Sequence, residues 1–276
     1  MIQGFDQLCC PIDGEPLTRH DRSWCCPHGH VFDCAKQGYV NLLPVQRKRS
    51  SDPGDSKAMV QARARFLSQG YYQPLADAIT ATVQALQPSR LLDAGCGEGY
   101  YLRQLLDQLE HSAHSLQVAA LDISKWATLA AAKADKRATY MVASNHHLPL
   151  PDHTIDCLIC LFGFPAEDEF ARVLAPEGHL LMVDPAAQHL HQLKQIIYPE
   201  VREKPYQLPL KNENWTLQQE QRLTFEVTLP NKQAIADLLL MTPHLFRASS
   251  AGRARAEALH QLTLTVDVYL RVFKQS

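Results

Sequence analysis

The sequence has 276 residues, enough for one large domain or for a small domain beside a medium one. Hydrophobic residues make up 46% and charged residues 20%, the composition of an ordinary globular protein. The formal net charge of -2 excludes a global positive field, so nucleic acid would have to be bound by local clusters such as Arg47-Lys48-Arg49. No apolar run could cross a bilayer and no signal-peptide pattern is present, so we expect a cytoplasmic protein without membrane contact.

The start of the chain is rich in cysteine, histidine, glycine and proline. Five of the eight cysteines fall within the first 34 residues. In a reducing compartment this clustering favours metal ligation or free thiols over disulfides. We therefore predict a small metal-binding module over residues 1–45, a basic linker over 46–58 and a larger domain over 59–276.

The remainder of the chain alternates between strand and helix patterns. Residues 62–86 predict two helices broken near Gly70, and the segments that follow predict strands at 90–95, 116–124, 138–144, 154–163 and 178–185 with helices at 100–110, 125–135 and 166–175. The last part predicts a strand at 221–230, a helix at 231–240 and a strand at 262–273. This order indicates an α/β fold with a mostly parallel, seven-stranded sheet.

The stretch LLDAGCGEGYY, residues 91–101, places glycines between a predicted strand and a predicted helix. Glycines at such a turn let the main chain approach a ligand closely, as they also do in dinucleotide-binding folds. The spacing after Asp93 differs from the dinucleotide pattern and resembles the class I S-adenosylmethionine (SAM) methyltransferases. That resemblance implies that the loop binds SAM through Asp93, Gly95, Gly97, Glu98, Gly99 and Tyr100.

The ends of the next two strands fit the same resemblance. Asp122 stands where an acid of that class binds the ribose hydroxyls, and Ser144 or Asn145 stands where the adenine edge is met. An ordinary glycine turn, with Asp122 as a helix cap, is the simpler alternative.

The fourth strand and its exit, CLICLFGFP, narrow the choice of methyl acceptor. They lack the Asn/Asp-Pro-Pro-aromatic signature of enzymes that methylate exocyclic amines. Cys157 and Cys160 alternate with apolar residues inside the strand, which predicts packed core thiols rather than nucleophiles. A heteroatom that is nucleophilic or easily deprotonated remains as the acceptor.

A longer resemblance covers residues from about 10 to 248. The segments 32–79 and 92–101, with GYVNLLP and DPGDS, closely resemble the 23S ribosomal RNA guanine-N1 methyltransferases of the RlmA type. The resemblance implies methylation of N1 of a guanine in a hairpin loop of 23S ribosomal RNA, a zinc module and a homodimer. It also implies SAM contacts at Tyr72, Gly97, Glu98 and His189.

Removal of the guanine N1 proton calls for an acceptor, since the nitrogen must be free to attack. Asp184, His189 and Glu98 are the candidates, and water or the RNA itself is an alternative. The base must also leave its surroundings, and Phe162, Phe164 or Tyr206 could stack on it.

The zinc site of this family has a C-x2-C pair followed by C-x3-H, and here the corresponding residues are Cys10, Asp13, Cys26 and His30. A carboxylate can ligate zinc, although an oxygen in place of a sulfur should weaken binding. Two alternatives stay open: a shifted site that uses Cys9, Cys25 or His28, and a module without metal.

Two other functions compete with ribosomal RNA methylation. A methyltransferase that acts on a small molecule would share the glycine loop but would not need the module or the basic linker. A protein that binds RNA or the ribosome and keeps SAM only as a structural ligand would not need a complete glycine loop with Asp122.

Overall fold

The computed structural model describes residues 1–47, 50–110, 115–201, 206–211 and 213–276. Lys48 and Arg49 of the basic cluster lie outside the described residues, as do the side chains of Arg47 and Phe246. None of the described helices has the length and apolar character needed to span a membrane.

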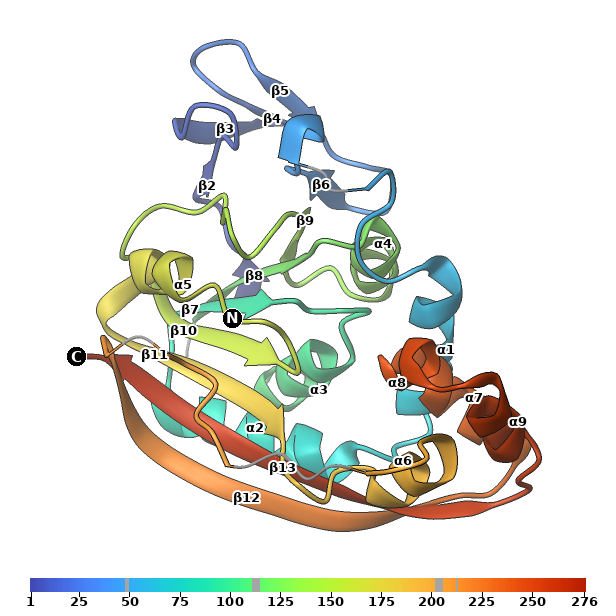
Figure 1. The fold of residues 1–276 in the computed structure, drawn as a ribbon. Helices are drawn as coiled ribbons and strands as arrows, with labels where there is room; N and C mark the ends of the chain where they lie inside the picture. Colours follow the sequence, from blue (N-terminus) through green and yellow to red (C-terminus); the bar gives the residue numbers. More distant parts are fainter. Residues whose placement is uncertain (48–49, 111–114, 202–205, 212) are drawn as a thin grey trace.

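A twisted central sheet forms the body of the molecule (Figure 1). In the described part of the chain its strands are β1 (Ile2–Gly4), β6 (Tyr39–Asn41), β7 (Arg90–Ala94), β8 (Leu116–Asp122), β9 (Thr139–Val142), β10 (Ile155–Leu161), β11 (Leu174–Pro185), β12 (Trp215–Leu229) and β13 (Leu262–Gln275). The order is β12-β13-β11-β10-β7-β8-β9-β6, and β1 also pairs with β8. β13 runs antiparallel to β11 and β12, whereas the other pairs are parallel.

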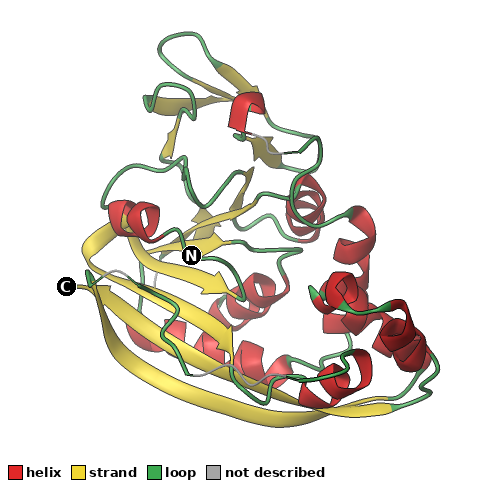
Figure 2. Cartoon of the chain, viewed as in Figure 1, coloured by secondary structure: helices red, strands yellow, loops and turns green. Residues whose placement is uncertain are grey.

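The helices pack mainly on one face of this sheet. They are α1 (Lys57–Leu67), α2 (Gln73–Leu86), α3 (Tyr100–Leu109), α4 (Lys125–Ala134), α5 (Glu167–Val173), α6 (His191–Ile197), α7 (Lys232–Met241), α8 (His244–Arg247) and α9 (Ser250–Glu257). Leu75 of α2 and Leu102 of α3 belong to the apolar cluster on one face, and Phe170 of α5 belongs to the cluster on the other. Most of the described helices, red in Figure 2, therefore cover one face of the sheet, and α5 covers part of the other.

Side chains of β10 point to opposite faces of the sheet, so this strand contributes to both apolar clusters. Cys157 and Cys160 are fully buried on opposite faces, in contact with different clusters. Burial raises the pKa of each thiol to about 12, because a thiolate would lose its hydration there. The prediction of packed core thiols is confirmed.

A second, four-stranded sheet stands beyond the central one, at the top of Figure 1. It contains β2 (Leu8–Cys9), β3 (Pro16–His20), β4 (Ser23–Cys25) and β5 (Val31–Asp33), and the short 3-10 helix η1 (Val45–Arg47) follows β6. We call residues 5–34, which carry these strands, the ribbon.

The first 45 residues are less separate than their sequence suggests. The seven expected strands are β7 to β13, and β1 and β6 add two more from the predicted module, so the described sheet has nine strands instead of seven. Trp24 and Leu17 of the ribbon lie in the same apolar cluster as Leu92 and Leu158 of the sheet. The ribbon is too small to bury these side chains alone, so its apolar side is completed by the larger domain.

Candidate functional site

The loop between β7 and α3 is a tight glycine turn at the carboxyl edge of the sheet. Gly95, Gly97 and Gly99 have φ of 95°, 57° and 82°, in the left-handed region that glycine adopts without strain. The N–H groups of Gly95 and Cys96 donate to the carbonyl of Leu121 at 2.9 Å. The turn therefore packs against the end of β8, whose last residue is Asp122.

Asp122 holds the turn in place through its side chain. Its two carboxylate oxygens accept the N–H of Gly97 at 3.0 Å and the N–H of Ser124 at 2.7 Å. Burial raises the pKa of Asp122, and these two hydrogen bonds oppose the increase. Each carboxylate oxygen can accept a further hydrogen bond, so Asp122 can still bind hydroxyl groups of a ligand.

Asp93 is a buried carboxyl group with an unused acceptor. It is 2% exposed, and its Oδ1 has no hydrogen-bond partner among the described residues. Burial and the nearby charge of Asp122 raise the pKa of Asp93 to about 7. An unpaired buried acceptor is costly, and a cationic ligand would relieve the cost. The site therefore fits SAM, whose sulfonium and ammonium groups are positive.

The two sides of the glycine turn differ in character. On one side, Ser144 and Asn145 follow β9, and the N–H of Ala143 donates to the carbonyl of Asp122 at 3.2 Å. On the other side, Phe162 follows β10 with φ of 54°, a conformation that is strained for an aromatic residue. The exposed ring of Phe164 comes next. Polar groups thus stand on the side where the family resemblance predicts the adenine, and aromatic rings stand on the opposite side.

His189 is held as a neutral hydrogen-bond donor. It is buried after β11, its ring centroid lies 6.0 Å from that of Phe162, and its Nδ1 accepts the N–H of Asp267 at 3.3 Å. This contact places the proton on Nε2. Burial lowers the pKa of His189 to about 3, so the imidazole is a poor proton acceptor at neutral pH.

Asp184, near the end of β11, is a better proton acceptor than His189. Its side chain is 23% exposed, and its Oδ2 lies 3.4 Å from Nη1 of Arg271. Burial raises its pKa, and Arg271 opposes this effect. A carboxylate with a raised pKa and partial access to solvent can take up a proton.

Three other predicted cofactor residues direct their side chains toward protein groups. The carboxylate of Glu98 accepts from Arg103 at 2.9 Å, and the hydroxyl of Tyr100 donates to Gln73 on α2 at 3.2 Å. Tyr72 is buried, with its ring against Phe66 and Phe225. Arg103 also donates to the main-chain carbonyl of Glu98 at 2.6 Å, so this residue is paired through both its side chain and its carbonyl.

The four predicted zinc ligands come together in the ribbon. The ligand atoms of Cys10, Asp13, Cys26 and His30 all lie within 4.8 Å of one another. Oδ2 of Asp13 lies 3.1 Å from both Cys26 Sγ and His30 Nδ1, whereas its Oδ1 accepts the N–H of Glu15. One carboxylate oxygen is thus fixed by the backbone and the other faces the cluster. Two sulfurs, one nitrogen and one oxygen fit a tetrahedral zinc ion.

The alternative ligands take other places. Of the three, His28 approaches Asp13 with Nδ1 at 3.0 Å from Oδ2, and its side chain is 62% exposed. In the described chain, Cys9 and Cys25 are outside the group of converging ligand atoms. The geometry favours the unshifted set.

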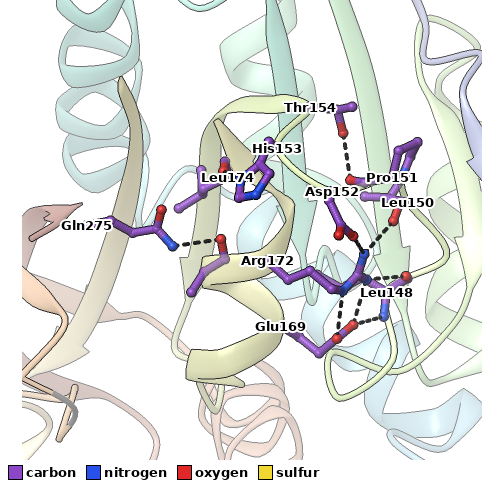
Figure 3. A network of polar contacts seen from close by, with 11 residues as sticks. Leu148, Leu150, Pro151, Asp152, His153, Thr154, Glu169, Arg172, Leu174 and Gln275 are labelled. Atoms are coloured by element: carbon purple, nitrogen blue, oxygen red, sulfur yellow. Dashed lines mark hydrogen bonds and ion pairs between the residues drawn. The ribbon is translucent and has the colours of Figure 1, made fainter. Parts of the chain in front are cut away.

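Arg172 of α5 anchors a loop of the larger domain on which the ribbon rests, and Figure 3 shows its contacts with that loop. Its guanidinium binds both oxygens of Glu169, at 2.9 and 2.8 Å, and Asp152 at 2.7 Å. It also donates to the carbonyls of Leu148 and Leu150, both at 2.9 Å. We call residues 148–152 the seam loop, because its Pro149 carbonyl accepts the N–H of Cys9 at 2.9 Å, one residue before a predicted zinc ligand.

A cavity of about 620 Å³ lies at this seam, between Asp13 on the ribbon and Arg172 on α5. The carboxylates and carbonyls that surround the Arg172 guanidinium already take its donors, so this arginine is not available to a phosphate group. Sequence analysis missed the role of Arg172. The only local signal was its spacing of three from Glu169, which is common on helices.

The glycine turn with its two acids and the ribbon with its ligand cluster define the class of protein: a SAM-dependent methyltransferase that carries an N-terminal zinc ribbon. Two family profiles agree with this class. The zinc-ribbon profile described as "RlmA, N-terminal" matches residues 8–51, and the profile described as "Methyltransferase domain" matches residues 92–182.

Three relatives narrow the class to a family. A protein of Bacillus subtilis (strain 168), named as a proposed 23S rRNA (guanine-N1)-methyltransferase, is 30% identical over 96% of this chain and 95% of its own length. A protein of Micromonospora griseorubida with the same description is 40% identical over 67% of this chain and 68% of its own length. The 23S rRNA (guanine(748)-N(1))-methyltransferase of Streptomyces fradiae is 38% identical over 67% of this chain and 66% of its own length. The chain belongs to the family of 23S rRNA (guanine-N1)-methyltransferases of the RlmA type.

Proposed function

We propose that the protein transfers a methyl group from SAM to N1 of a guanine in a hairpin loop of 23S ribosomal RNA. The buried Oδ1 of Asp93, which has no hydrogen-bond partner among the described residues and lies near the charge of Asp122, is the observation that carries the cofactor half. The names of the relatives and the length over which they align support the RNA half.

Each part of the cofactor has a candidate partner. Asp122 would accept the ribose hydroxyls, Ser144 or Asn145 would meet the adenine edge, and Asp93 would lie beneath the positively charged methionyl end. Bound SAM supplies a methyl group on a sulfonium, which is reactive toward nitrogen nucleophiles. Because Nδ1 of His189 accepts the N–H of Asp267, the neutral ring carries its proton on Nε2. This Nε2–H could donate to an oxygen of the ligand.

The acceptor guanine would enter from the side of Phe162 and Phe164. An exposed aromatic ring can stack on an extruded base, a contact worth about 1–3 kcal/mol per base. Attack by N1 requires that its proton leave, and we assign that proton to Asp184. Asp184 suits this role better than His189, whose pKa is too low, and Glu98, whose carboxylate is paired with Arg103.

The ribbon, in this proposal, holds zinc with Cys10, Asp13, Cys26 and His30 and contacts RNA beside the catalytic edge. We retain the division into a metal-binding module over residues 1–45, a basic linker over 46–58 and a methyltransferase domain over 59–276, although β1 and β6 pair with the central sheet. To the module we assign recognition of RNA. A ribosomal RNA substrate also supports the proposal that the protein is cytoplasmic. The homodimer that the family resemblance implies belongs to the proposal as well, and sedimentation velocity tests it.

Methylation of transcribed 23S ribosomal RNA tests the function. With labelled SAM, the label should enter RNA, and a primer-extension stop at one guanine should locate the methyl group on the pairing edge. Asp184→Asn should lower the rate and leave SAM binding unchanged. Label that enters a metabolite extract but not RNA would instead identify a methyltransferase for small molecules. SAM binding without any transfer would favour a purely RNA-binding role.

A further inference from the structure

An arginine on α1 lies directly over the glycine turn. Nη1 of Arg63 is 3.6 Å from the position that a Cβ on Gly97 would occupy. The charge of Arg63 also opposes the increase that burial causes in the pKa of Asp122 and of Tyr101. Arg63 therefore faces the surface of the turn that the cofactor must approach.

Contacts from two distant segments orient this guanidinium. Nη1 lies 2.5 Å from Oδ2 of Asp55, and Nη2 donates to the carbonyl of Met241, at the end of α7, at 3.2 Å. A guanidinium has five N–H groups, and these two contacts leave donors for another acceptor. Its side chain keeps 22% exposure, so a ligand can reach it.

Asp55 is itself fixed in place. Its carbonyl accepts the Ser124 hydroxyl at 2.6 Å, and Trp126 Nε1 donates to Asp52 at 2.8 Å. Gly54 lies so close to the start of α4 that a Cβ would fall 2.9 Å from the backbone nitrogen of Ser124. Residues 52–55 are thus bound to the segment that follows Asp122. Through the carboxylate of Asp55, they fix the position of the Arg63 guanidinium.

The charges around the turn identify the partner of Arg63. Asp93 can neutralise a cationic part of a ligand, whereas Arg63 can bind an anionic part. SAM has one anionic group, the carboxylate of its methionyl moiety, and arginine suits a carboxylate because its donors form a planar fork. We propose that Arg63 binds the methionyl carboxylate of SAM and of its product, S-adenosylhomocysteine. This inference rests on the proposed function, since it presumes that the site binds SAM.

Calorimetry with a pair of ligands tests the proposal. Decarboxylated S-adenosylhomocysteine differs from S-adenosylhomocysteine by the carboxylate alone. The wild-type protein should bind the complete product about 10- to 100-fold more tightly, the range expected for a hydrogen-bonded charge pair. Arg63→Met should bind both ligands with the same affinity, close to that of the wild type for the decarboxylated one.

The matched control is Arg65→Met, two residues further on the same helix. Arg65 pairs with Asp237 on α7 instead of facing the turn, so this variant should keep the wild-type preference for the carboxylate. An Arg63→Met variant that keeps the preference would overturn the inference. A wild-type protein that binds both ligands equally would also overturn it, even if Arg63→Met failed to fold. No binding of either ligand to the wild type would refute the proposed function itself.

Discussion

The edge of the sheet that carries the glycine turn, which we call the cofactor edge, and the ribbon are both candidate ligand sites. Different interactions stabilise the two sites. At the cofactor edge, main-chain hydrogen bonds to Leu121 and Asp122 shape the turn without any ligand. In the ribbon, the four converging side chains lie outside the strands, in the segments that connect them, and bring together two thiols, a carboxylate and an imidazole. The first site is therefore preorganised by the central fold, whereas metal binding in the second should contribute to local folding.

Loss of one proposed zinc ligand should affect the two regions most differently. In Cys26→Ser, we expect zinc affinity to fall roughly 1000-fold, more than the 10- to 100-fold loss that changes outside the ligand set cause. The affinity for SAM should change less than about twofold, because the glycine turn does not depend on the ribbon. Metal analysis and calorimetry on the same preparation measure both quantities.

Asp13→Cys should have the opposite effect on zinc affinity to Cys26→Ser. A third sulfur should tighten zinc binding relative to the natural carboxylate. After cobalt substitution, the thiolate-to-metal charge-transfer band should grow in the ratio of three sulfurs to two. Equal bands in the two proteins would mean that position 13 does not ligate the metal.

Asp122→Ala should produce the converse separation. We expect about 100-fold weaker SAM binding, since the variant loses the proposed ribose acceptor and the contact that holds Gly97. Zinc content should stay unchanged. The control is Asp156→Ala, because Asp156 also accepts backbone N–H groups, those of Ser89 and Arg90, but at the start of β7. Comparable loss of SAM affinity in both variants would indicate a general effect on the sheet.

Arg172→Met should loosen the connection between the two regions. Without the guanidinium, the seam loop loses its anchor, and the ribbon that binds it through Cys9 should be positioned less well. We expect RNA methylation to fall about tenfold at subsaturating RNA with SAM affinity unchanged. Arg137→Met is the control, since its partners Asp107 and Asp135 lie within the methyltransferase domain. An unchanged RNA KM in Arg172→Met would contradict this positioning role.

The smallest expected effect is the change of SAM affinity with pH, which we attribute to Asp93. Asp93 has a pKa of about 7 in the folded protein, above the value of about 4 for a free aspartate. Its protonation therefore stabilises the unliganded fold at low pH, and this contribution is lost as pH rises through 7. A cationic ligand favours the ionised form, so SAM affinity should rise severalfold from pH 5.5 to 7 and then level off. Asp93→Asn should flatten this part of the profile in calorimetry.

The sequence predicted the elements whose signals are local. Strand–glycine turn–helix order, the seven strands β7 to β13 and the break between α1 and α2 at Gly70 follow from apolar periodicity and from the backbone freedom of glycine. The ligand set of the ribbon followed from spacing together with the family resemblance. The roles of individual polar residues were harder to predict. Sequence treated His189, Asp184 and Glu98 alike as proton acceptors, but the contact with Asp267, the pair with Arg271 and the pair with Arg103 give them different properties.

The sequence by itself therefore determined the class of fold and the edge of the sheet at which the cofactor site is built. Tertiary structure decided which distant segments of the chain contact one another around the sheet. It joined β1 and β6 to the central sheet, placed Arg63 between Asp55 and Met241, and connected α5 to Cys9 through the seam loop. Periodicity and turn chemistry act over a few residues, whereas burial, proton position and ion pairing depend on groups that only the folded chain brings into contact.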